Sequence, residues 1–179
     1  MMRRAIGATL ALAGAATAAH AEPRRGGMTG GGMVGVGPAT SERFSGTGAG
    51  FALAGHLGWL AAASDGRFGA EAQLIGSQTW FGGRAHVDGV LLGALRAYPV
   101  PRLAITFGLG VTAAENETDS FVAGGAAFAA SVAVELKRWR RAALSVQLLG
   151  YGGRFDDGDA GHLIVGVGID AFGLSTPPR

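Results

Sequence analysis

The stretch R-L-A-I-T-F-G-L-G-V-T, residues 102–112, alternates large apolar residues with small or polar ones. Leu103, Ile105, Phe107, Leu109 and Val111 occupy every second position, and most of the positions between them are glycine, alanine or threonine. Successive side chains of a β-strand point to opposite faces, so this period of two predicts a strand with one apolar face. The other face has little bulk, which suits a crowded, strongly curved backbone.

The same alternation recurs along the chain between turn-like segments. We expect eight strands, at residues 28–37, 45–60, 67–78, 85–98, 102–112, 121–136, 142–151 and 161–172. The sixth segment also allows a helix, because residues 121–134 carry no charge, but Gly124, Gly125, Val132 and Val134 weaken that alternative.

The first twenty-two residues show an export pattern. Arg3 and Arg4 precede an uncharged, alanine-rich run, and A-H-A then precedes Glu22. Two cations, a short apolar run and a small-x-small motif are typical of a secretory signal peptide. We therefore expect residues 1–21 to be removed by cleavage between Ala21 and Glu22, with Ala19 and Ala21 as the small residues. A retained membrane helix is disfavoured, because about 20 apolar residues are needed to span a bilayer.

Composition limits what the mature chain can be. Removing 21 of the 179 residues leaves 158, enough for one domain, and the loss of Arg3 and Arg4 lowers the formal charge from +2 to about zero. With 16% charged residues, no basic face for nucleic acid is expected. The chain has no cysteine, so its stability must come from burial, backbone hydrogen bonds or a membrane. We expect a flexible leader at 22–32, a barrel at 28–172 and a short tail at 173–179.

Two kinds of eight-stranded barrel use such strands. A soluble, lipocalin-like carrier is apolar inside and charged outside, whereas an outer-membrane barrel is apolar outside and small or polar inside. The non-apolar face has too few charges for a solvated surface, which favours the membrane barrel and leaves the soluble one as the alternative. The charges expected to line the lumen are Arg67, Glu71, Asp88, Arg96, Arg102, Glu135 and Asp170.

The connections suggest an orientation. One alternate set, 61–66, 99–101 and 137–141, is short, and the other, 38–44, 79–84, 114–120 and 152–160, includes longer acidic segments. Short turns in the periplasm and longer loops outside are typical of such barrels. Aromatic residues near the strand ends suggest two interfacial girdles: Phe44, Trp59, Trp80, Phe81, Tyr98, Phe121, Trp139, Tyr151, Phe155 and Phe172.

The last strand, G-V-G-I-D-A-F at 166–172, resembles the C-terminal assembly signal of the small eight-stranded outer-membrane β-barrel proteins of Gram-negative envelopes. The resemblance in pattern covers nearly all of the mature chain. It implies location in the outer membrane, with outer-membrane lipids and the barrel assembly machinery as partners. It also implies an assembly signal at Gly166, Gly168 and Phe172, although the family typically ends at the aromatic and this chain continues to Arg179.

No motif predicts catalysis, a cofactor or a metal. Residues 30–35 match G-x-G-x-x-G without the strand before and the helix after that phosphate binding needs. His56, His86 and His162 come from separate strands, and the acids at 156–159 lack the spacing of a calcium loop. We therefore expect no cofactor, and a solvated acidic loop.

The functional expectation is a non-enzymatic, monomeric outer-membrane barrel with a structural or surface-interaction role in the cell envelope. Eight strands leave no open aqueous channel, which disfavours a diffusion porin. The soluble hydrophobic-ligand carrier is one alternative. A lipid-modifying enzyme is the other, and it would pair Ser45 or Ser120 with His56 or His162 at the membrane edge.

Overall fold

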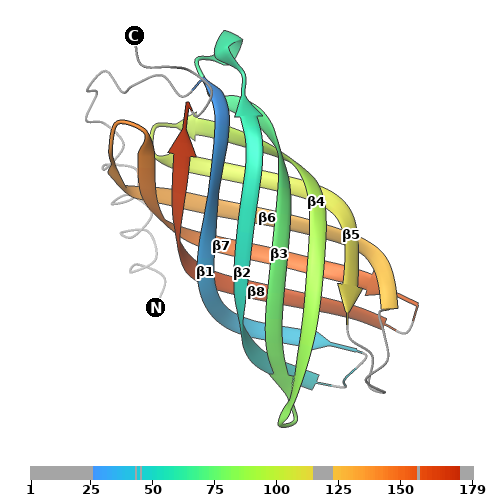
Figure 1. Cartoon of the computed structure of the whole chain (residues 1–179). Helices are drawn as coiled ribbons and strands as arrows, with labels where there is room; N and C mark the ends of the chain where they lie inside the picture. The colour runs from blue at the N-terminus through green and yellow to red at the C-terminus, as the bar shows by residue number, and fades with distance from the viewer. Residues whose placement is uncertain (1–25, 43, 45, 115–122, 157, 174–179) are drawn as a thin grey trace, which may run out of the picture.

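The computed structural model describes residues 26–42, 44, 46–114, 123–156 and 158–173. Eight antiparallel strands form one closed barrel in chain order (Figure 1). The strands are β1 (Gly27–Ser41), β2 (Gly46–Leu60), β3 (Phe68–Phe81), β4 (Arg84–Val100), β5 (Leu103–Ala114), β6 (Ala123–Arg138), β7 (Ala142–Phe155) and β8 (Gly158–Phe172). This confirms the predicted all-β, eight-stranded antiparallel up-and-down barrel.

The structure excludes one alternative for the sixth segment and corrects the predicted start of the barrel. The sixth segment is a strand, so its helical alternative is excluded over Ala123–Arg138. Residues 27–32 belong to β1 and not to a flexible leader, because β1 must pair with both β2 and β8 to close the barrel. The predicted signal peptide and its cleavage residues Ala19, Ala21 and Glu22 lie outside the described residues, as does the tail beyond Gly173.

The strand register sets the size of the barrel. Starting at Gly31 of β1, we follow each residue to its partner on the next strand until the path returns to β1. The path returns at Ser41, ten residues farther along β1. It passes through His56, Gln73, Leu92, Gly110, Ala127, Gly153 and Ala160. With usual strand spacings, a shear of ten over eight strands gives a tilt of about 40° and a backbone radius of about 8 Å. Side chains fill an interior of that radius.

The outer surface carries a continuous apolar belt. Every strand contributes exposed large apolar side chains, among them Val34, Leu53, Leu57, Leu74, Leu91, Leu95, Phe107, Leu109, Phe128, Leu148, Val165 and Ile169. Among the described residues, no charged side chain interrupts this belt. The outward charges Arg154 and Asp159 lie beside the turn that connects β7 to β8, at the end of the barrel. A soluble carrier has the reverse distribution, so the soluble alternative does not fit this surface.

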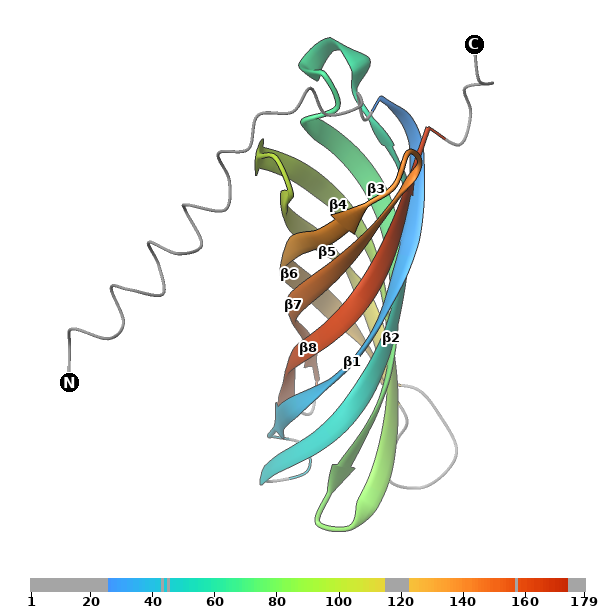
Figure 2. The same ribbon diagram turned by 90° about the vertical axis from the view of Figure 1, so that its left-hand side faces the viewer.

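Three turns, the start of β1 and the end of β8 share one end of the barrel, here called the terminal end. The three turns are the connections 61–67, 101–102 and 139–141. The β3–β4 hairpin lies at the opposite end (Figure 2). The expected long loop at 152–160 is wrong, because β7 and β8 run on until only residues 156–157 separate them. The longest connection of the terminal end, 61–67, has seven residues and that of the opposite end, 115–122, has eight, so loop length does not distinguish the two ends.

The expected girdles are also largely wrong, because most of those aromatic side chains turn inward. Phe81, Tyr98, Tyr151, Phe155 and Phe172 are buried, and the ring of Phe44 stacks on that of His86. Phe121 lies outside the described residues. The three tryptophans, Trp59, Trp80 and Trp139, are exposed near strand ends, as interfacial residues would be.

Helices contribute little to the part of the chain that is described. A short 3-10 turn, η1 (Ala62–Ser64), follows β2. None of the helices in these residues is long and apolar enough to cross a bilayer.

Candidate functional site

The barrel interior is the candidate site, because the strand alternation directs nearly all the polar side chains there. Along the axis it has two polar clusters, one toward each end, with an apolar layer between them. The residues of each cluster come from strands far apart in sequence, which the closure of the sheet brings together (Figure 1).

The first polar cluster lies toward the terminal end and is a chain of ion pairs. The Arg96 Nε lies 2.9 Å from the Glu71 Oε2, and its Nη1 donates a 2.7 Å hydrogen bond to the Asp170 Oδ1. The His56 Nε2 is 3.1 Å from that same Asp170 oxygen. On the other side of the cluster the Gln73 amide donates a 2.6 Å hydrogen bond to the Glu71 Oε1. Each buried charge therefore has an opposite charge beside it, as burial requires.

The second polar cluster lies toward the opposite end. The Ser77 hydroxyl donates to the Asp88 Oδ1, and the His162 Nε2 lies 3.2 Å from the Asp88 Oδ2. The Tyr151 ring stacks on the His162 ring with centroids 4.4 Å apart and planes 2° apart. This stacking holds the imidazole against the carboxylate.

An apolar layer separates the two polar clusters. It is made of buried side chains from both sides of the barrel: Met33, Ile75, Val90, Leu92, Leu149 and Ile164. Ile75, Leu92 and Ile164 are almost wholly inaccessible to solvent. Among the described residues this layer separates the polar side chains of the two clusters, so side chains fill the middle of the barrel.

The structure places five of the seven expected lumen charges inside: Glu71, Asp88, Arg96, Glu135 and Asp170. It brings Glu71, Arg96 and Asp170 together, keeps Asp88 in the second polar cluster, and pairs Glu135 with Arg138 near the terminal end.

Arg67 and Arg102 were wrongly predicted to line the lumen. Both are exposed in turns, because β3 and β5 each begin one residue later than expected, at Phe68 and Leu103. Arg102 also has a left-handed φ of 69°, which belongs to a turn and not to a strand.

Arg138 is an interior charge that the sequence pattern did not reveal. The expected sixth strand ended at residue 136, but β6 continues to Arg138 through a register shift between Glu135 and Lys137. A β-bulge of this kind re-aims side chains, so Arg138 reaches Glu135 inside and also lies over the Phe172 ring, 5.5 Å from its centroid. A bulge has no period-two signature that could have predicted it.

The three described histidines lie apart from one another. His56 is in the first polar cluster and His162 in the second, while His86 stacks on Phe44. Across the described ranges no three His, Asp or Glu side chains gather in a way that could hold an ion. The glycine-rich residues 30–35 lie within β1, with no helix after them.

Of the residues expected for a lipid-modifying enzyme, the structure describes the two histidines. Ser45 and Ser120 lie outside the described residues, and His56 and His162 point into the lumen, away from the membrane edge. In the second polar cluster, Ser77 donates to Asp88 and the imidazole lies on the other side of that carboxylate. A serine nucleophile needs the imidazole itself as the acceptor of its proton, so this order does not form a catalytic pair.

The predicted assembly signal has packing roles in the structure. Phe172 is buried with Leu60 and Tyr98 at the terminal end. Gly166 and Gly168 lie where β8 meets β1, and a Cβ at Gly166 would come within 2.4 Å of the Val34 carbonyl oxygen. Gly166 and Gly168 therefore allow close approach of β8 and β1, and Phe172 packs at the terminal end.

Comparisons with known proteins find relatives by structure and not by sequence. No protein-family model and no curated protein matches the chain. The solved structure of Neisserial surface protein A (NspA) is 11% identical, with a TM-score of 0.55 over 82% of this chain and 96% of that one. Ail, the attachment invasion locus protein of Yersinia pestis, is 10% identical, with a TM-score of 0.54 over 81% of this chain and 99% of that one. At these identities the likeness establishes the fold alone.

Proposed function

We propose that this protein is a monomeric, non-enzymatic barrel of the Gram-negative outer membrane, with a structural or surface-interaction role in the envelope. The observation that carries the proposal is the uninterrupted apolar belt around a closed barrel. A closed barrel satisfies its backbone hydrogen bonds internally, which is the condition for lying in hydrocarbon. Outer-membrane lipids and the barrel assembly machinery are its proposed partners, and nucleic acid is not.

The filled interior and the short connections narrow the role. The apolar layer across the lumen argues against a diffusion channel. At the end opposite the terminal end, the connections 42–45, 82–83, 115–122 and 156–157 have two to eight residues each, which is little surface for a large adhesive contact. NspA is named a surface protein and Ail an attachment invasion locus protein, and a surface role for this chain rests on that analogy of fold.

The test is folding into vesicles followed by gel electrophoresis with and without boiling. We expect the full-length mature chain to co-float with lipid vesicles and to migrate differently before and after boiling, because a membrane barrel stays folded in detergent until heated. Expression in a Gram-negative host should place it in the outer-membrane fraction after the signal peptide is removed. Recovery from the periplasm without detergent, together with no mobility shift, would contradict the proposal.

A further inference from the structure

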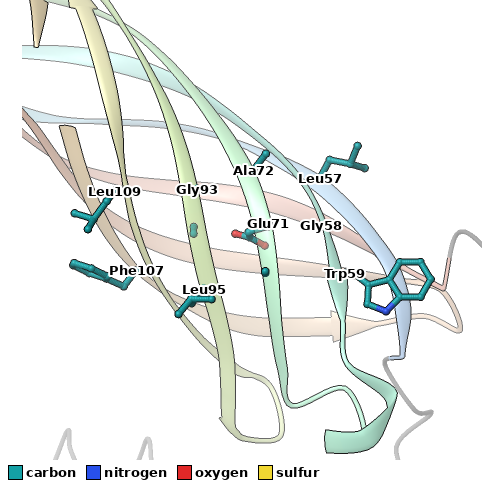
Figure 3. Close-up of a pocket in the computed structure, with 11 residues that line it drawn as sticks. Leu57, Gly58, Trp59, Glu71, Ala72, Gly93, Leu95, Phe107 and Leu109 are labelled. Carbon is teal, nitrogen blue, oxygen red and sulfur yellow. The ribbon is translucent and has the colours of Figure 1, made fainter. Parts of the chain in front are cut away.

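The outward wall of β2–β5 is hollowed on its terminal side. A trough of about 670 Å³ runs over the strands there, and Ala70, Ala72 and Gly93 are among the residues that line it. Ala72 and Gly93 lie between larger side chains (Figure 3). Leu57 and Trp59 stand on one side, and Leu95, Phe107 and Leu109 on the other. The volume is within the range of about 300–1,000 Å³ that is typical of small-molecule sites.

The strand register explains the trough. Ala72 pairs with Leu57 on one side and Gly93 on the other, and Gly93 pairs with Leu109. Two alanines and a glycine thus form the low centre of a surface whose neighbours are bulky. A Cβ added at Gly93 would meet no atom within 4 Å, so the space above it is open. In a membrane, the occupant of an open apolar trough on this wall is an acyl chain.

Two arginines stand at the terminal side of this trough. Arg67 directly precedes β3, the strand of Ala70 and Ala72. Arg102 directly precedes β5, the strand of Phe107 and Leu109. Their backbones are held by neighbouring strands, because the Arg67 carbonyl accepts from the Tyr98 N–H at 2.7 Å and the Arg102 carbonyl from the Glu135 N–H at 2.8 Å. Both side chains are exposed. Ala70 is three residues from Arg67, or about 10 Å along the strand.

Charge at the two ends of the barrel differs in sign. In the described turns and strand ends of the terminal end, the exposed cations are Arg67, Arg102, Lys137, Arg140 and Arg141, and Asp65 is the exposed acid. At the opposite end the exposed charges of the described residues are Glu42, Asp156 and Asp159 with Arg84 and Arg154. A phosphate group is therefore favoured at the terminal end, beside the trough.

We propose that the trough and the two arginines form a binding site for one anionic phospholipid. The acyl chain lies over Ala70, Ala72 and Gly93, and the headgroup phosphate lies at Arg67 and Arg102. Trp59 stands on the β2 side of the trough, near the end of that strand, and is 55% exposed. Tryptophan favours the boundary between headgroup and hydrocarbon, and this position suits that preference. This site rests on the proposed membrane location of the belt.

Native mass spectrometry of the folded full-length barrel tests the site. The protein is reconstituted with equal amounts of phosphatidylglycerol and phosphatidylcholine with matched chains, then extracted in a neutral detergent at low ionic strength. We expect one retained phosphatidylglycerol, preferred over phosphatidylcholine by on the order of fivefold for each arginine. The R67Q/R102Q double variant should keep a lipid but lose the preference, and G93L, which fills the trough, should lose both lipids.

The chain offers matched controls. Gly76 faces outward toward the other end of β3, and a Cβ there also meets nothing within 4 Å, so G76L adds the same bulk outside the trough. Arg84 is exposed at the opposite end, so R84Q removes a cation away from the site. Both controls should retain phosphatidylglycerol as the unmodified protein does. A shift in gel mobility on boiling confirms that each variant is folded.

Three outcomes would overturn the site: equal retention of the two lipids by the unmodified protein, equal lipid loss in G76L and G93L, or dimers that disappear in G93L. The last would make the trough an interface between copies of this chain. In each of these cases the protein has still entered vesicles, so the proposed function stands. Failure of the unmodified chain to enter vesicles would instead contradict the proposed function itself.

Discussion

At the scale of single residues, the most consequential contact is the buried Glu71–Arg96–Asp170 network. The Arg96 side chain lies between two carboxylates, and its removal leaves Glu71 without a basic partner and Asp170 with His56 alone. We expect R96Q to lower the free energy of unfolding by about 3–5 kcal/mol, the usual result of breaking a buried ion pair from one side. Urea unfolding of the vesicle-inserted barrel, followed by tryptophan fluorescence, measures this difference.

An exposed ion pair supplies the control for that variant. The Arg154 Nε lies 3.4 Å from the Asp159 Oδ1, and both side chains are largely solvent-exposed. Because solvent screens such pairs, R154Q should leave the unfolding midpoint nearly unchanged. Equal losses in R96Q and R154Q would show that burial of the Arg96 network has no special importance.

Glycines on the two faces of neighbouring strands should differ sharply in their tolerance of a methyl group. A Cβ at Gly110, which faces inward, would lie 1.9 Å from the Leu91 carbonyl oxygen, whereas one at outward Gly93 meets nothing within 4 Å. We expect G110A to cost about 1–3 kcal/mol through overpacking and G93A to be neutral or slightly stabilising. The same urea titration compares them, and a G110A barrel as stable as G93A would contradict the close approach of β4 and β5.

At the scale of the element, β8 closes the barrel and ends in a buried ring. Phe172 packs with Leu60, Tyr98 and Ala143, beneath Arg138. We expect F172A to lower the free energy of unfolding by about 3–5 kcal/mol, as large-to-small changes at buried aromatics do. Refolding of purified protein into synthetic vesicles isolates this packing effect, since no assembly machinery is present.

The same variant separates packing from recognition. If F172A refolds in vesicles with unchanged stability and yet fails to reach the outer membrane in cells, Phe172 acts as an assembly signal and its packing is unimportant. If stability falls in vesicles, the failure in cells has a physical cause within the barrel. F172L keeps most of the apolar volume and should recover much of the stability.

At the scale of the whole molecule, the belt and the ends of the barrel should respond differently to a charge. Leu109 is 61% exposed in the middle of β5, and Ala85 is exposed beside the β3–β4 hairpin. In vesicles we expect L109R to cost about 2–4 kcal/mol and A85R about 0–1 kcal/mol, because the cost of a lipid-facing arginine depends on depth. A charge tolerated equally at both positions would mean that hydrocarbon does not surround the belt.

Much of this architecture follows from local sequence. Alternation in segments such as 102–112 and 161–172 determined the strands, and the contrast of a bulky face with a bare one determined which side is outward. These predictions succeeded because the period of two is a property of each strand by itself. It also identified five interior charges, since parity alone decides the side on which each one lies.

Only the tertiary structure decided where each strand ends, which charges meet, and which surfaces are hollow. Arg67 and Arg102 have inward parity but stand one residue before their strands, and Arg138 turns inward through a bulge. The ion pair of Arg96 with Asp170 joins residues 74 positions apart. The trough at Gly93 depends on which residues of four strands lie side by side. Register and shear are set by closure of the whole sheet, and no single segment of sequence contains them.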